Sequence, residues 1–277
     1  MSDSVNNKVI LVTGASSGIG KASAQKLLSE GHVVYGAARR IDQMEDLKKS
    51  GGIILKMDVT NEQDLVGGVG RIMQEEGRID VLFNNAGYGL YGAVEDIPLE
   101  DVRRQFEVNL FGLARLTQLV LPSMRERKRG PIINTSSMGG RIYTPLGAWY
   151  HATKHALEGW SECLRFELSQ FNIDVVIIEP GIIETGFGDV LSAPMLHYSG
   201  EGPYGQMAEK IAEGTRRSYD SGGGSPASVI ADVVSKAVSS GKPKTRYVAG
   251  KLARPLMFMR KYLGDRIFDR ILASQIG

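Results

Sequence analysis

Short runs of consecutive apolar residues recur along the chain. Val9–Thr13 is typical of them, because it is rich in β-branched residues, does not alternate with polar residues and ends at a glycine. Strands that are buried on both faces of a sheet have this pattern. It predicts strands at Val9–Thr13, Val33–Ala38, Ile53–Met57, Val81–Asn84, Ile132–Ser136, Val175–Glu179 and Arg246–Val248.

Most of the intervening segments repeat their apolar residues every three or four positions, which is the spacing of one helix face. This spacing predicts helices at Ala22–Ser29, Leu65–Met73, Val102–Met124 and Ala148–Phe171. Alternating strands and helices imply crossover connections and a parallel sheet that is covered on both faces. We therefore expect an α/β fold, doubly wound, with a mainly parallel seven-stranded sheet in a single domain over residues 1–277.

The stretch Pro180–Pro226 is rich in Gly, Ser and Pro and is predicted to be a loop. It is too long for a passive connection, and long loops are often lids over a site. We expect residues 182–225 to form an inserted substrate-binding lid. Its apolar residues suit a lipophilic substrate, although they fit packing on the core equally well. They are Phe187, Val190, Leu191, Met195, Leu196 and Tyr198.

Composition excludes several classes of protein. The chain has 34 glycines among 277 residues, a single cysteine and a net charge of +2. One cysteine forms no internal disulfide, and we expect Cys163 to be a buried thiol within a helix. The charge gives no reason to expect nucleic-acid binding. There is no apolar run long enough for a membrane span, and the polar residues 1–8 lack a secretory pattern, so we expect a cytoplasmic protein.

The C-terminal segment is unusually basic. Residues 241–277 carry nine basic and two acidic side chains, so their net charge is +7 and that of the other residues is −5. Apolar residues recur there at helical spacing, which predicts a C-terminal strand followed by a helix. A basic amphipathic helix can lie on a membrane surface. The alternative, which we favour, is a helix that packs on the sheet and leaves its basic face in solvent.

A glycine-rich turn follows the first predicted strand and opens the first predicted helix. Glycines allow the backbone to approach a pyrophosphate closely, and a helix N-terminus offers free N–H groups and partial positive charge. Alone, such a turn could be an ordinary one; between a strand and a helix, it indicates dinucleotide binding. The candidate residues are Gly14, Ser16, Ser17, Gly18, Ile19 and Gly20.

The end of the second predicted strand indicates which dinucleotide is bound. Arg39 and Arg40 lie 19 and 20 residues after Gly20, where NAD-binding proteins have an acidic residue. An arginine suits the 2′-phosphate of NADP instead, and the Ser16 hydroxyl could contact the same phosphate. The alternative is a solvated arginine pair. We favour NADP(H).

Tyr150 and Lys154 are spaced to share one helix face. A tyrosine has a pKa near 10, and a neighbouring cation would lower it, which makes a general acid/base. Ser137 follows the predicted strand Ile132–Ser136, where its hydroxyl could hold a carbonyl oxygen. A Tyr–Lys pair alone could be a surface pair, but the glycine-rich turn makes a catalytic site the better interpretation.

Taken together, these motifs resemble the short-chain dehydrogenase/reductase family, in its compact single-domain branch with a Rossmann fold. The matching segments occur in the family's order and spacing. They are Thr13–Gly20, Asn84–Gly87, Asn109, Ser137, Tyr150–Lys154 and Pro180–Thr185. The C-terminal third more loosely resembles 17-beta-hydroxysteroid-dehydrogenase-like and retinol-dehydrogenase-like members.

The resemblance implies roles for individual residues. Tyr150 would exchange a proton with the substrate oxygen, Lys154 would lower the pKa of Tyr150 and bind the nicotinamide ribose, and Ser137 would orient the carbonyl. Asn109 would hold a water molecule that links Lys154 to solvent. Further cofactor contacts would come from Asp58, Val59, Asn85, Ala86, Gly87, Pro180, Gly181, Ile183 and Thr185.

The predicted function is an NADP(H)-dependent oxidoreductase that interconverts a carbonyl and a secondary or primary alcohol. The expected substrate is a lipophilic small molecule, such as a steroid-like or retinoid-like ketone or alcohol. A catalytically silent NADP sensor on the same fold is the alternative, but it would not need Ser137, Tyr150 and Lys154 together. Lyase or epimerase relatives usually carry a longer C-terminal domain. The resemblance also implies a homodimer or homotetramer. No metal is expected; His151 and His155 are predicted to be structural or solvated, whereas His197 could line the substrate cleft.

Overall fold

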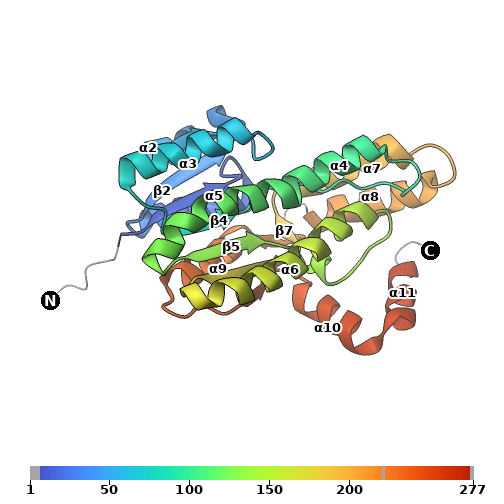
Figure 1. Ribbon diagram of the computed structural model, residues 1–277. Helices are drawn as coiled ribbons and strands as arrows, with labels where there is room; N and C mark the ends of the chain where they lie inside the picture. The colour runs from blue at the N-terminus through green and yellow to red at the C-terminus, as the bar shows by residue number, and fades with distance from the viewer. Residues whose placement is uncertain (1–6, 220–221, 275–277) are drawn as a thin grey trace.

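A seven-stranded sheet forms the centre of the protein, as Figure 1 shows for the computed structural model, which describes residues 7–219 and 222–274. Every neighbouring pair of strands is parallel, in the order β3-β2-β1-β4-β5-β6-β9. The strands are β1 (Val9–Thr13), β2 (Val33–Ala38), β3 (Ile53–Lys56), β4 (Val81–Asn84), β5 (Pro131–Thr135), β6 (Asp174–Pro180) and β9 (Arg246–Ala249). The strand order reverses between β1 and β4, where doubly wound sheets bind ligands. The predicted fold is confirmed.

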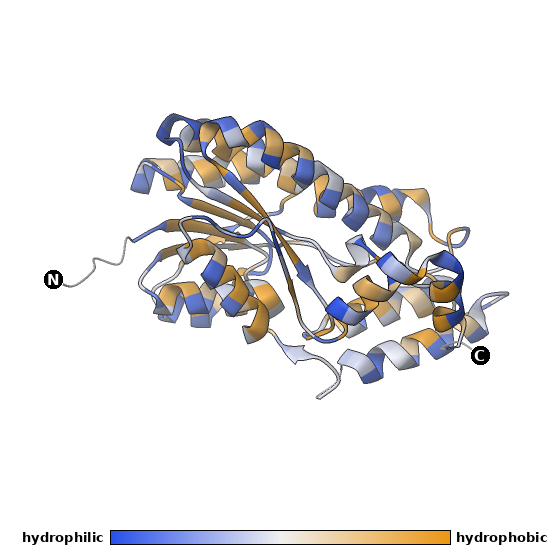
Figure 2. Cartoon of the chain, turned by 90° about the horizontal axis from the view of Figure 1, so that it is seen from below, coloured by the Kyte–Doolittle hydropathy of each residue, from blue (hydrophilic) through white to orange (hydrophobic). Residues whose placement is uncertain are grey.

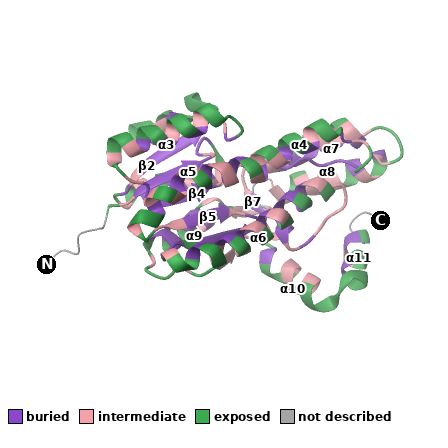
Figure 3. Cartoon of the chain, viewed as in Figure 1, coloured by how far each residue is buried: buried purple, intermediate pink, exposed green. Residues whose placement is uncertain are grey.

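Helices cover both faces of the sheet. Val9 and Leu11 of β1 pack toward one helical layer, while Ile10 and Val12 pack toward the other, and all four are fully buried. Burial on both sides is the reason why the strands are continuous apolar runs. Figure 2 shows orange strands between the helical layers, and Figure 3 shows the same strands as buried. One layer has α1 (Gly18–Ser29), α2 (Glu45–Lys49) and α9 (Ser228–Ser239); the other has α3 (Glu62–Glu76), α5 (Gly112–Arg127) and α6 (Ala148–Leu168).

The helix predicted at Val102–Met124 is divided into three parts. It begins as α4 (Leu99–Phe106), passes through a π-helical turn at Glu107–Phe111 and continues as α5. The buried Asn109 lies in this turn. π-Turns widen a helix locally and are frequent at functional sites.

The prediction of a loop over Pro180–Pro226 is wrong for most of its length. Residues 187–219 form two helices, α7 (Phe187–Ser199) and α8 (Gly205–Tyr219), which pack against each other. The short strands β7 (Ile183–Glu184) and β8 (Ser225–Pro226) pair in parallel beside them. The helices form despite Pro194 and several glycines because α7 and α8 bury residues such as Met195, Ala208 and Ala212 in a shared core.

The C-terminal segment also differs from the favoured prediction. Two helices, α10 (Ala253–Leu263) and α11 (Asp265–Ala273), follow β9 and are separated by Gly264, which has a φ of 73°. In the small core around Ile142, α11 packs through Phe268 and Leu272, and α10 packs through Leu256, Met257 and Met259. The predicted packing on the sheet is therefore wrong. Within the described residues, no helix combines the length and the apolar content that a bilayer crossing requires.

Cys163 is exposed, so the prediction of a buried thiol is wrong. The residues of α6 that face the interior nearby are Ser161 and Leu164. Cys163 lies between them in sequence, and adjacent positions on a helix point in different directions.

Candidate active site

A cavity of about 1020 Å³ lies at the carboxyl ends of the central strands. It brings together nearly all of the site residues predicted from the sequence. The predicted residues that line it are Gly14, Ser16, Ser17, Gly18, Ile19, Arg39, Arg40, Asp58, Val59, Asn85, Ala86, Gly87, Ser137, Tyr150, Lys154, Pro180, Gly181, Ile183 and Thr185. The other two, Gly20 and Asn109, lie behind the wall of the cavity, where they support it.

The glycine-rich turn has the geometry of a phosphate cradle. Gly14 and Gly18 have φ values of 68° and 52°, which side chains disfavour. A Cβ atom on Gly20 would overlap the Gly14 carbonyl oxygen. Ser17, the N-cap of α1, makes no side-chain capping hydrogen bond, and the first turn has no acidic residue. The helix N-terminus therefore offers its N–H groups to an anion, so the residues present fit a dinucleotide.

The loop after β4 is fastened to this turn. The backbone N–H groups of Asn85 and Ala86 donate hydrogen bonds of 3.0 and 3.1 Å to the Thr13 hydroxyl. The Asn85 side chain donates in return to the Thr13 carbonyl, at 3.2 Å. A Cβ atom on Gly14 would lie 3.0 Å from the Cα of Ala86. The cavity floor is therefore rigid at the strand reversal.

Two arginines that follow β2 make one end of the cavity positively charged. Arg39 and Arg40 are exposed side chains that line it. Asp58 lies across from them at the end of β3. Burial raises the pKa of Asp58, but hydrogen bonds from the N–H and hydroxyl of Thr60, together with the charge of Arg39, outweigh burial and hold it below its usual value.

Tyr150 and Lys154 are both buried in the cavity wall, on one face of α6. Burial raises the pKa of Tyr150 to about 12, while a hydrogen bond with Ser137 acts in the opposite direction. The expected lowering of the Tyr150 pKa is therefore wrong for the protein by itself. The Lys154 ammonium lies 6.0 Å from the centre of the Tyr150 ring.

The lysine is itself perturbed. Burial lowers the pKa of Lys154 to about 8, and the charge of Glu158 opposes this change. The Lys154 ammonium donates a hydrogen bond of 2.9 Å to the Thr135 carbonyl. With a pKa of about 8, Lys154 has lost its proton at the pH where Tyr150 titrates, so it does not hold the pKa of Tyr150 down.

Asn109 holds the loop that carries Tyr88. Its side chain accepts a hydrogen bond from the Tyr88 N–H at 3.0 Å and donates to the Tyr88 carbonyl at 2.8 Å. It also donates to the Thr153 hydroxyl at 3.1 Å. A Cβ atom on Gly87 would lie 3.1 Å from the Asn109 side-chain oxygen and 3.7 Å from the Lys154 ammonium. Asn109 is thus placed directly behind the lysine.

The histidines near the site are structural. His151 is buried and contacts the Gly139 carbonyl at 2.8 Å and the Thr144 N–H at 3.0 Å. Burial lowers its pKa to about 4, so it is neutral and joins the Ser137 loop to α6. His197 is exposed and does not line the cavity, so the idea that it faces the cleft is wrong.

Aromatic side chains enclose the end of the cavity next to Tyr150. Phe187 of α7 lies 6.0 Å from the Tyr150 ring, and Tyr219 of α8 lies 6.2 Å from Phe187. Of the apolar residues expected in the lid, Phe187 and Val190 line the cavity, whereas Leu191 packs beneath Tyr150. Tyr219 was not predicted, because no motif marks the end of α8.

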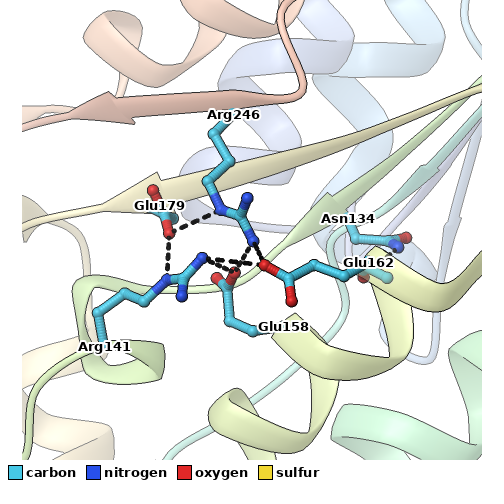
Figure 4. Close-up of polar contacts among 7 residues, drawn as sticks. Asn134, Arg141, Glu158, Glu162, Glu179 and Arg246 are labelled. Carbon is cyan, nitrogen blue, oxygen red and sulfur yellow. Dashed lines mark hydrogen bonds and ion pairs between the residues drawn. The ribbon is translucent and has the colours of Figure 1, made fainter. Parts of the chain in front are cut away.

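A cluster of charged side chains, two of them buried glutamates, lies where α6 meets β6 and β9 (Figure 4). Arg141 contacts Glu158 at 3.2 Å, Glu162 at 3.4 Å and Glu179 at 3.1 Å. Arg246 contacts Glu158 at 3.0 Å and Glu179 at 3.5 Å, and it also pairs with Glu162. We call these five residues the charge cluster. Three carboxylates thus share two guanidinium groups.

The charge cluster is linked to the site through α6, because Glu158 lies one turn after Lys154. Two of its carboxylate oxygens, Glu158 Oε1 and Glu179 Oε2, have no hydrogen-bond partner among the described residues. Burial, followed by repulsion from Glu158, raises the pKa of Glu179. No sequence motif marks this cluster, since its members come from four separate segments.

Comparisons with known proteins agree with this geometry. A family model described as "short chain dehydrogenase" matches residues 8–195. A 3-ketodihydrosphingosine reductase from Bacteroides thetaiotaomicron is 45% identical over 182 residues, which are 66% of this chain and 66% of that protein. The uncharacterized oxidoreductase YbbO of Escherichia coli is 35% identical over 97% of this chain and 95% of its own. A short-chain dehydrogenase structure from Streptomyces avermitilis is 34% identical, with a TM-score of 0.81 over 99% of this chain and 96% of that one. The looser resemblance to hydroxysteroid dehydrogenases stays a prediction.

Proposed function

The chain belongs to the short-chain dehydrogenase/reductase family, and from this premise we propose that it is an NADP(H)-dependent oxidoreductase that interconverts a carbonyl compound and an alcohol. The observation that carries the proposal is that Ser137, Tyr150 and Lys154 meet in one cavity with the glycine-rich turn. A protein that only senses the cofactor would need the turn but not these three side chains.

Each of the three side chains has a role that its surroundings support. When bound, the cofactor supplies or accepts the hydride. Tyr150 is protonated at neutral pH because its pKa is about 12, so it can give its proton to the carbonyl oxygen during reduction. Ser137 accepts a hydrogen bond from the Gly139 N–H at 3.0 Å, and its O–H, which is within hydrogen-bonding reach of Tyr150, can donate to the same substrate oxygen. Lys154 is the cation that favours the tyrosinate left behind.

The mechanism is tested by Tyr150→Phe, which removes one hydroxyl group and keeps the ring packing. We expect turnover to fall by about 10²–10⁴-fold, the usual contribution of a general acid. NADPH binding, followed by nucleotide fluorescence, should change little. A variant that keeps most of its turnover would refute the role of Tyr150.

The preference for NADP(H) is supported by Arg39 and Arg40. In Arg39→Ala, we expect NADPH binding to weaken by roughly 10–100-fold, the range for a lost hydrogen bond to a charged group. NADH lacks the 2′-phosphate, so its binding should stay nearly the same. An equal loss for both nucleotides would contradict the assignment.

A lipophilic substrate is supported by the aromatic end of the cavity. Phe187, Val190 and Tyr219 surround the approach to Tyr150, and burial strongly raises the pKa of Tyr219. The helices α7 and α8 that carry them, within residues 182–225, would form the substrate-binding lid. The Bacteroides relative is named as a reductase of a ketone on a sphingoid lipid, which is a substrate of the same class.

A series of methyl ketones of increasing chain length tests this class, with NADPH oxidation as the readout. We expect kcat/KM to rise with each added methylene until the cavity is filled, by up to about fourfold per methylene. In Phe187→Ser the rise should be shallower. A preference for small polar ketones would contradict the proposal.

A homo-oligomer, dimer or tetramer, is supported by apolar side chains on the outer helices. Phe166 of α6 is 84% exposed and Phe111, beside α5, is 52% exposed. Sedimentation velocity of the wild type and of Phe111→Ser/Phe166→Ser tests this assembly. A wild type that sediments as a monomer would contradict it.

A further inference from the structure

The C-terminal hook, residues 251–274, comprises α10 and α11 and stands away from the body of the protein (Figures 1 and 3). The inner face of the hook packs against the body of the protein. Phe268 is fully buried and lies edge-on to the Tyr143 ring at 5.2 Å. Leu272 and Ile142 complete this small core. The hook is therefore attached to the body along one side.

The outer face of the hook exposes large apolar side chains. Phe258 is 60% exposed and Tyr262 is 61% exposed, and their rings lie 4.7 Å apart, one turn from each other on α10. The other exposed apolar residues of the hook are Leu252, Leu263 and Ile267. Five of the twelve large apolar side chains exposed on the described residues lie in this short segment. Scattered exposed residues are ordinary, but a concentration of them marks a binding surface.

The charges of the hook are arranged so that its outer face is basic. Residues 251–274 hold six basic and two acidic side chains. Both acidic groups are engaged: Asp265 pairs with Arg260, and Asp269 accepts a hydrogen bond of 2.6 Å from the Tyr143 hydroxyl. The Lys261 ammonium lies 5.0 Å from the centre of the Tyr262 ring, beside the exposed aromatic pair. Three exposed arginines of the hook have no ion-pair partner among residues 7–219 and 222–274; they are Arg254, Arg266 and Arg270.

We propose that the outer face of the C-terminal hook binds the surface of membranes that contain anionic lipids. Exposed aromatic rings beside unpaired cations suit the interface between lipid headgroups and acyl chains. The charge favours anionic lipids, because the segment 241–277 carries +7 and the other residues −5. The favoured sequence interpretation, a stripe packed on the sheet, is wrong, because Leu256 and Met259 of α10 pack instead on the small core around Ile142. Phe258 and Tyr262 stay outside that core.

Co-sedimentation of the full chain with vesicles tests the proposal. We expect binding to equimolar phosphatidylglycerol/phosphatidylcholine vesicles, little binding to phosphatidylcholine alone, and release in high salt. Phe258→Ser/Tyr262→Ser should lower the partition coefficient at least tenfold. Arg254→Glu/Arg266→Glu should lower it further than neutral substitutions would, since each cation is worth about fivefold near an anionic surface. Leu99→Ser, which removes a comparably exposed apolar side chain (56%) at the start of α4, is the matched control and should bind as the wild type does.

The possible results distinguish a membrane from a second copy of the chain as the binding partner of the outer face of the hook. NADPH oxidation should be unchanged in the hook variants, because these side chains are exposed and outside the cavity, and this shows that the variants are folded. Failure of the wild type to bind anionic vesicles overturns the proposal, as does equal binding by all variants. A change of oligomeric state in Phe258→Ser/Tyr262→Ser, without vesicle binding by the wild type, would assign the surface to a second copy of the chain. Each of these results is independent of whether the protein oxidises NADPH.

Discussion

Removing one guanidinium from the charge cluster should cost much of the protein's stability. The change is Arg246→Met, which keeps a long side chain on β9 and deletes its charge. Glu158 and Glu179, 5% and 0% exposed in their side chains, would then depend on Arg141 alone. A buried carboxylate that loses its partner keeps its desolvation cost without the compensating attraction.

The expected loss of stability follows from how deeply Glu158, Glu179 and Arg246 are buried. Breaking a fully buried pair costs about 3–5 kcal/mol. The Arg246 side chain is 24% exposed and Arg141 remains in place, so we expect the lower end, about 3 kcal/mol. For a chain of this length that corresponds to a decrease of roughly 5–6 °C in Tm.

The loss should also depend on pH in a defined direction. The folded-state pKa of Glu179 is already raised, and removing Arg246 raises it further, so the folded state binds a proton more readily than the unfolded chain. The free energy of unfolding then falls as pH rises above the ordinary glutamate pKa of about 4.3, and it recovers when pH is lowered and Glu179 is protonated in the folded state. The deficit of Arg246→Met should be largest at neutral pH and smaller near about pH 5.

Urea denaturation followed by circular dichroism measures the deficit at each pH. Arg115→Met is the matched control, because Arg115 forms a similar pair with Glu62 on the surface, where both partners are well exposed and the pair contributes about 1 kcal/mol or less. In Glu179→Gln/Arg246→Met, at least half of the stability should return. The reasoning is refuted if Arg246→Met loses no more than Arg115→Met, or if its deficit is constant between about pH 8 and pH 5.

Three further predictions concern the cavity wall and α6. Gly20→Ala should weaken NADPH binding at least tenfold in a fluorescence titration, because its Cβ would overlap the Gly14 carbonyl. In the control Gly67→Ala, the new Cβ on α3 meets nothing within 4 Å, so NADPH should bind normally and the free energy of unfolding should rise by up to about 1 kcal/mol. Normal binding by both variants would contradict the phosphate cradle. Lys154→Met should be more stable to urea than the wild type at neutral pH by about 2 kcal/mol, because the pKa of Lys154 is about 8 in the folded protein and higher in the unfolded chain. The gain should fade as pH rises from about 8 to 10, and a gain that did not change with pH would refute the burial of a charged lysine as its cause. Cys163 should react with an aromatic disulfide reagent without denaturant, with Cys163→Ser as the blank; reaction only after unfolding would contradict its exposure.

The strands and the cofactor end of the site could be predicted because their physical causes are local. A strand such as β1 is buried on both faces, so every residue in it must be apolar, and the observed bounds differ from the predicted ones by at most one residue. The glycine-rich turn requires left-handed backbone at Gly14 and Gly18. Only particular residues allow these conformations, so the sequence itself records them.

Other features depend on contacts between distant segments and were missed for that reason. The helices α7 and α8 contain glycines and a proline, and they are stabilised by the core that they form with Tyr91 and Tyr150. The pKa of Tyr150 is set by burial, which spacing on a helix does not reveal. Cys163 is exposed and not buried as predicted, because helical spacing alone does not reveal which face of α6 meets the sheet.

Arg246 follows its three acidic partners by many residues in the sequence, and this order has a consequence for biosynthesis. The ribosome makes Glu158, Glu162 and Glu179 well before Arg246, which follows Glu179 by 67 positions. At about 5–20 residues per second, roughly 3–13 s pass between the synthesis of Glu179, the last of the three carboxylates, and that of Arg246, their second counterion. During that interval Arg141 is their one cationic partner in the cluster, and β6 lacks its outer neighbour β9. The nascent chain can therefore complete the charge cluster behind Lys154 only after β9 has been made.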